Sequence, residues 1–183
     1  MKTSSDTSSS KSTITTDPIT VVIETTLGSM EAELYPDKAP ITVENFMSYA
    51  EEGYYDGTIF HRVIADFMIQ GGGFDTEMVE KPTKDAIKNE ADNGLKNEAG
   101  TLAMARTMVV DSATSQFFTN TKANTFLDNG QRDFGYAVFG KITAGNDVLE
   151  AIENVKTSTQ KIGSGSHQNV PVEMLEIISI KKK

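Results

Sequence analysis

Residues 55–73 read YDGTIFHRVIADFMIQGGG, and this stretch constrains the fold more than any other part of the chain. The segment Thr58–Ile64 is rich in β-branched and aromatic residues and predicts a strand, and Phe67–Gln70 predicts a second one. The glycine run that follows predicts a tight bend or a close approach of the backbone. It does not predict a phosphate-binding loop, because no Lys-Ser or Lys-Thr pair and no clear helix follow it.

Short strands and two helices are predicted on both sides of this stretch. A helix is expected to begin at Pro40 and to end before Gly53, since apolar residues recur between them at helical spacing. A second, shorter helix is expected over Val148–Val155. Further strands are predicted at residues 19–26, 29–34, 101–105, 116–120, 137–142 and 172–180. Many short strands with two helices favour a mainly all-β barrel or sandwich, without fixing the number or order of the strands.

The composition excludes several classes of function. Among 183 residues, 17 basic and 26 acidic side chains give a net charge of −9, which argues against binding nucleic acid. The chain has no cysteine, so thiol nucleophiles, disulfides and thiolate metal sites are absent. His61 and His167 lie too far apart for a short two-histidine metal motif, and no metal or other cofactor is expected. No apolar run is long enough for a membrane-spanning helix.

The two ends of the chain differ from the middle. Residues 1–17 include eleven Ser or Thr and predict a disordered tail, followed by one domain over 18–180 and a basic tail at 181–183. The first tail is either a simple linker or a spacer left behind a removed export signal. The lack of an apolar segment after Met1 favours the cytoplasm, whereas the linker-like composition favours the periplasm, so the compartment stays open.

Arg62 is the residue that points most clearly to chemistry. On a strand, Phe60 and Arg62 lie on one face and His61 on the other. An arginine beside aromatic and thioether side chains suggests a cation held over an apolar floor. The alternative is a surface arginine whose aliphatic stem covers the core. A lone histidine on the opposite face is expected to be a hydrogen-bonded structural group.

Three motifs in a fixed order carry a resemblance to a known family. They are residues 55–73, Ser115-Gln-Phe-Phe118 and Val138-Phe-Gly140. Together they resemble the cyclophilins, the cyclosporin-binding family of peptidyl-prolyl cis-trans isomerases, and above all its bacterial branch. The resemblance extends over Ile19–Ile180 and implies a closed eight-stranded antiparallel β-barrel capped by two α-helices. It also implies an isomerase of X-Pro peptide bonds that assists protein folding without a cofactor.

The same resemblance implies a role for individual residues. Arg62 is expected to be catalytic, stabilising the twisted-amide transition state, with Gln70 beside it. The substrate-binding positions are expected to be Phe60, His61, Phe67, Met68, Ala105, Arg106, Gln116, Phe118, Phe126, Leu127 and Tyr136. Within this set, the proline ring is expected to be received by Phe67, Met68, Phe118 and Leu127. His61 is expected at the rim of the groove and not as a base.

Three positions depart from the best-known eukaryotic pattern. Arg106 replaces an asparagine, although both can hydrogen-bond a substrate backbone. Phe126 replaces a tryptophan and removes an indole N–H donor, and Tyr136 replaces a histidine. These changes predict weak binding of cyclosporin rather than loss of catalysis.

The expected partners are proline-containing unfolded or flexible polypeptides, and the chain is expected to be a monomer. A binding module that holds such segments without turnover is the alternative, and the presence of Arg62 favours the enzyme.

Overall fold

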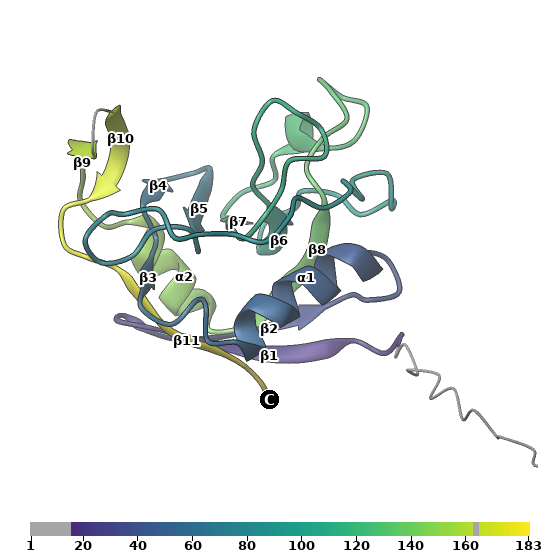
Figure 1. The fold of residues 1–183 in the computed structure, drawn as a ribbon, viewed down its shortest axis with the longest axis horizontal. Coiled ribbons are helices and arrows are strands. Elements are labelled where there is room, and N and C mark those ends of the chain that lie inside the picture. Colours follow the sequence, from purple (N-terminus) through teal and green to yellow (C-terminus); the bar gives the residue numbers. More distant parts are fainter. Residues whose placement is uncertain (1–15, 163–164) are drawn as a thin grey trace, which may run out of the picture.

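The computed structural model describes residues 16–162 and 165–183, and its main feature is a nine-stranded antiparallel sheet (Figure 1). The strands of this sheet are β1 (Ile19–Thr25), β2 (Gly28–Leu34), β3 (Thr58–Ile59), β4 (Arg62–Ile64), β5 (Met68–Gly71), β6 (Thr101–Met104), β7 (Phe117–Asn120), β8 (Val138–Ala144) and β11 (Glu176–Lys182). They lie in the order β3-β11-β1-β2-β8-β6-β7-β5-β4. The sheet curls strongly into a half-barrel. Most of the predicted tail, residues 1–15, lies outside the described residues.

The mainly β architecture with two helices is confirmed, but the prediction of a closed eight-stranded barrel is wrong. The segment predicted as one strand at Thr58–Ile64 is divided, because Ile59 pairs with β11 and Arg62 pairs with Gln70 of β5. Phe60 and His61 between them belong to no strand. Within residues 16–162 and 165–183, no ladder pairs β3 with β4. The two end strands are therefore joined by the covalent chain and not by a ladder. Two backbone hydrogen bonds link β3 to the segment after β5: the Ile59 N–H donates to the Phe74 carbonyl at 3.0 Å, and the Gly72 N–H donates to the Ile59 carbonyl at 3.4 Å.

A separate two-stranded hairpin was not predicted from the sequence. It consists of β9 (Thr157–Ile162) and β10 (Gly165–Pro171) and projects at the upper left of Figure 1. Its residues are mostly polar, so no pattern of alternating apolar positions marks them. The last strand, β11, begins at Glu176 and not at residue 172. It extends to Lys182, which pairs with Val21, two residues beyond the predicted domain boundary.

The two helices are α1 (Pro40–Glu51) and α2 (Asn146–Glu153), and a 3₁₀ turn, η1, covers Thr125–Leu127. Helix α1 begins at Pro40 as predicted, although no side chain caps it locally. Instead Glu90, 48 residues further along the chain, accepts hydrogen bonds from the Thr42 backbone N–H at 2.6 Å and from the Thr42 hydroxyl at 2.7 Å. This contact fastens the long polar segment before β6 to the start of the helix. None of the helices in the described part of the chain is long and apolar enough to cross a membrane.

The core is centred on aromatic rings under α1. The ring of Phe46 lies 5.2 Å from Tyr55, 5.3 Å from Phe117 and 5.1 Å from Phe139, centroid to centroid. All four side chains are buried. Since Phe117 lies on β7 and Phe139 on β8, this cluster holds the helix against two strands, and β7 also lines the cleft described below.

The substitution Phe46→Ala is expected to lower the free energy of unfolding by about 3–5 kcal/mol, because it leaves a cavity among three rings. Urea denaturation measures this loss. The matched control is Ile41→Ala in the same helix, where the side chain is 39% exposed and the expected loss is below about 1 kcal/mol. Equal losses for the two variants would contradict the central position of Phe46.

Candidate active site

Most of the predicted site residues line a single cleft with a volume of about 300 Å³. Strands β4, β5 and β7 carry part of the lining, and the rest comes from the end of β6, from η1 and from the segment before β8. The lining residues are Arg62, Phe67, Met68, Gln70, Ala105, Arg106, Phe118, Phe126, Leu127, Arg132 and Tyr136. Ten of these eleven residues were predicted from the sequence, and the sheet brings them together from positions 62 to 136. Their individual roles remain predictions.

Arg62 presents an exposed guanidinium at the edge of this cleft. Its Nη1 donates a long hydrogen bond of 3.4 Å to Gln70 Oε1, and Gln70 Nε2 donates one of 2.9 Å to Gln116 Oε1. The register of the strands places these side chains side by side, because Arg62 lies opposite Gln70 and Gln70 lies opposite Phe118. In the part of the chain that the structure describes, Arg62 forms no ion pair. Its positive charge is therefore oriented by a neutral amide and is not neutralised.

The floor of the cleft is apolar and rigid. Met68, Phe118 and Leu127 are 2%, 4% and 5% exposed and pack with Ala103 and Val138 into a small cluster separate from the main core. Side chains within such a packed cluster have little freedom to move. The floor is therefore a preformed apolar surface next to the Arg62 guanidinium.

Two aromatic rings form the wall beyond the floor. Phe126 lies 5.7 Å from Phe67, and Tyr136 lies 5.7 Å from Phe118 in an edge-to-face arrangement. Arg132, which the sequence did not single out, stacks over Phe126 at 5.5 Å. Only its position between two aromatic segments of the chain could have pointed to it, and that is a weak signal.

Arg106 differs from Arg62 because its guanidinium is directed at the protein itself. The side chain is 4% exposed, and it stacks on Tyr136 at 4.5 Å. It donates to the Gly135 carbonyl at 3.1 Å, to the Thr107 carbonyl at 2.9 Å and to Asp133 at 3.3 Å. The sequence suggested that this residue hydrogen-bonds a substrate backbone, but the structure uses these donors to hold the cleft wall.

Three predicted site residues lie outside the cleft lining. Phe60 is buried and faces Phe117 edge-on at 6.4 Å, and Gln116 touches the cleft only through Gln70. His61 is buried and not at the rim. Its ring lies 4.6 Å from Phe74, and its Nδ1 has no hydrogen-bond partner among the described residues, so it is a packed group and not the hydrogen-bonded one that was expected.

The protonation of His61 is controlled mainly by its burial. Burial lowers the pKa of His61 from 6.5 to about 4, and the positive charges of His167 and Arg62 act in the same direction. His61 is therefore neutral at physiological pH. It places no second cation behind the guanidinium of Arg62.

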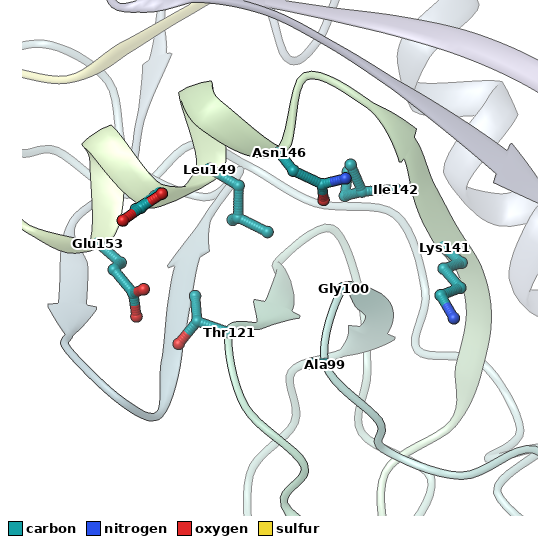
Figure 2. Close-up of a pocket in the computed structure, with 9 residues that line it drawn as sticks. Ala99, Gly100, Thr121, Lys141, Ile142, Asn146, Leu149 and Glu153 are labelled. Atoms are coloured by element: carbon teal, nitrogen blue, oxygen red, sulfur yellow. The ribbon is translucent and has the colours of Figure 1, made fainter.

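A second cavity of about 370 Å³ lies beside α2 (Figure 2). It is lined by Ala99, Gly100, Thr121, Lys141, Ile142, Asn146, Leu149, Glu150 and Glu153. Figure 2 shows Lys141 and Glu153 at opposite sides of it. None of the predicted site residues reaches this cavity, and the described residues contain no group of three His, Asp or Glu side chains suited to a metal ion. We therefore assign the candidate active site to the first cleft although it is the smaller one.

Comparisons with known proteins identify the family of this chain. Residues 20–182 match the family model described as cyclophilin type peptidyl-prolyl cis-trans isomerase. A peptidyl-prolyl cis-trans isomerase of Acinetobacter baylyi is 58% identical, over 89% of this chain and 85% of the relative. Peptidyl-prolyl cis-trans isomerase B of Escherichia coli is 50% identical, over 87% and 97%. A crystal structure of a cyclophilin type isomerase from Cryptosporidium parvum, obtained in the presence of the dipeptide Ala-Pro, aligns with a TM-score of 0.73 at 26% identity, covering 90% of this chain and 98% of that one.

The low pKa of His61 predicts a specific loss of stability in acid. Above pH 6.5 the residue is neutral in the folded and the unfolded chain, and the fold keeps its full stability. Between pH 6.5 and 4 the unfolded chain binds a proton that the folded chain excludes, so the free energy of unfolding is expected to fall by up to about 3 kcal/mol. Urea denaturation across this pH range measures the fall.

The variant His61→Gln provides the control, because it removes this titration and leaves every carboxylate and His167 in place. The difference in stability between the two proteins should therefore change with pH below 6.5 and be constant above it. Parallel profiles for the two proteins would show that His61 is protonated equally in both states.

Proposed function

The chain belongs to the cyclophilin-type peptidyl-prolyl cis-trans isomerases, and from this we propose that Arg62 catalyses the isomerisation by stabilising the twisted X-Pro amide. The single observation that carries the proposal is an exposed guanidinium, without an ion pair among the described residues, beside an apolar floor. Gln70 and Gln116 are proposed to orient it. Phe67, Met68, Phe118 and Leu127 are proposed to receive the proline ring.

The reaction requires rotation about a partly double bond, and no covalent bond is broken. Amide resonance keeps the X-Pro bond planar, and uncatalysed isomerisation takes tens to hundreds of seconds. In the transition state the amide is twisted and the proline nitrogen regains its lone pair. A donor directed at that nitrogen stabilises the twisted form more than the planar form, and it therefore lowers the barrier.

An arginine suits this task because it keeps its charge at any ordinary pH and offers several N–H donors in a fixed plane. Among the described residues, the Arg62 side chain makes one hydrogen bond, the long one to Gln70, so most of its donors stay available to a substrate. Gln70 also has its own amide nitrogen engaged by Gln116, which fixes its oxygen toward Arg62. The guanidinium is thus oriented before the substrate arrives and need not reorganise during the rotation.

The apolar floor supplies the complementary part of the mechanism. It is proposed to hold the pyrrolidine ring still while the preceding carbonyl rotates, and to exclude water that would weaken the field of the arginine. Turnover in milliseconds requires a gain of about 10⁴–10⁵-fold, which corresponds to about 5.5–7 kcal/mol. One well-placed charged donor supplies about 3–4 kcal/mol of this. The rest is assigned to the preference of the pocket for the twisted conformer.

The substrates are proposed to be flexible or unfolded polypeptides, so that the enzyme assists folding steps limited by proline isomerisation. Support comes from the cleft itself, which opens at the surface and therefore admits a segment of a longer chain. Weak binding of cyclosporin is proposed on separate grounds. Phe126 offers the cleft an aromatic face that is 41% exposed, but it has no N–H donor.

The substitution Arg62→Ala is expected to lower kcat/KM on an Ala-Pro peptide by about 10²–10³-fold, because the donor to the twisted amide is lost. Arg62→Lys keeps the charge but not the planar fork, so an intermediate rate is expected. A coupled peptide assay measures these rates. The urea midpoint should remain that of the wild type because the side chain is exposed.

The same variant separates an isomerase from a binding module. The wild type should accelerate the slow, proline-limited refolding phase of a model protein, whereas Arg62→Ala should leave that phase at its uncatalysed rate. A wild-type rate for Arg62→Ala on the peptide would refute the catalytic role. Catalysis of the peptide without any effect on refolding would refute the folding role alone.

A further inference from the structure

Three consecutive apolar residues are exposed immediately beyond the cleft. Met108 is 98% exposed, Val109 66% and Val110 39%. Single exposed apolar residues are common on protein surfaces, but a run in which a methionine is almost fully exposed is a feature that requires explanation. The run lies in the segment between β6 and β7, and the core does not use it.

The segment that carries these side chains is fixed by hydrogen bonds. The Ser112 hydroxyl accepts from the Thr107 N–H at 3.0 Å and from the Thr107 hydroxyl at 2.8 Å, and it donates to the Val109 carbonyl at 2.6 Å. The Thr107 hydroxyl also accepts from the Val109 N–H at 3.2 Å. The polar groups therefore satisfy one another inside the turn, and this arrangement directs the apolar side chains outward.

The same segment is attached to the wall of the cleft. The buried Asn89 side chain donates to the Val110 carbonyl at 3.2 Å and to the Gly135 carbonyl at 3.0 Å. Gly135 also accepts from Arg106, which lines the cleft. Because Met108 follows Arg106 by two residues, their Cα atoms are at most about 7.6 Å apart. The exposed run therefore lies next to Arg106 of the cleft lining and is attached to the same wall.

Resting on the proposed function, we propose that Met108, Val109 and Val110 form an apolar contact surface for substrate side chains that flank the X-Pro bond. The occupant is the same polypeptide whose proline lies in the cleft, at positions beyond the proline and its neighbour. A flexible thioether accommodates apolar side chains of different shapes, which suits a substrate of variable sequence. The surface makes the enzyme prefer prolines with apolar neighbours, which are the prolines of segments destined for a protein core.

The test compares two peptides of equal length and with the same central Ala-Pro. One carries Leu and Phe at the outer positions on both sides, and the other carries Ser and Gln there. The wild type is expected to show a kcat/KM about fivefold higher for the apolar peptide, which is the effect of partly burying one or two such side chains. In the double variant Met108→Ser, Val109→Ser this ratio should fall to near one. Val109→Thr, which is nearly isosteric, should reduce it in part.

The control is Ile178→Ser on β11, where an exposed apolar side chain, 43% accessible, is removed away from the cleft. This variant should keep the wild-type ratio. A wild-type ratio near one, or an unchanged ratio in the double variant, would overturn the inference while leaving the isomerase intact. If neither peptide is turned over, the proposed function fails instead. In that case the inference is tested by calorimetry, as the ratio of the affinities for the apolar and the polar peptide. This ratio should be about fivefold in the wild type and near one in the double variant.

Discussion

The glycine run Gly71–Gly73 passes through a space too narrow for any side chain, and both the core and the cleft depend on that passage. An added Cβ at the first position would lie 2.6 Å from the Ile59 carbonyl oxygen, and at the second 2.9 Å from the Tyr55 ring. At the third it would lie 2.5 Å from Gln116. The missing methyl groups thus let the aromatic core close from one side. The absence of a side chain at Gly73 also lets the Gln116 side chain pack directly against the backbone, where its Oε1 accepts a hydrogen bond from Gln70.

Arg62 and Arg106, the two cleft arginines that the sequence singled out, differ in role because they differ in environment. Arg106 is stacked on Tyr136 and donates to two carbonyls and a carboxylate, and its side chain is almost entirely buried. Its donors are engaged by these partners and its own side chain is buried among them, so it is a fixed part of the wall. Arg62 has an exposed guanidinium and one long contact to an amide, so a substrate can engage it without breaking an ion pair.

Local patterns predicted the parts of this fold that local physics determines. Pro40 fixed the start of a helix, and the glycine run indicated the close approach that the structure shows. What failed depends on contacts distant in sequence. A sheet closes into a barrel only when its two end strands pair with each other. Here the segment predicted as one strand supplies both end strands, because Ile59 pairs with β11 and Arg62 pairs with β5. The burial of His61 likewise follows from Phe74 and from His167 on the hairpin that the sequence did not reveal.

That hairpin has a consequence for the electrostatics of the cleft. The rings of His61, Phe74 and His167 pack in succession, with centroids 4.6 Å and 5.9 Å apart, behind the strand that carries Arg62. A protonated imidazole there would add a like charge next to the guanidinium and favour a neutralising carboxylate nearby. Because burial keeps His61 neutral down to a pKa of about 4, no such counter-charge is required. The charge of Arg62 therefore remains available to the substrate, and the neutral imidazole of His61 adds no like charge beside it.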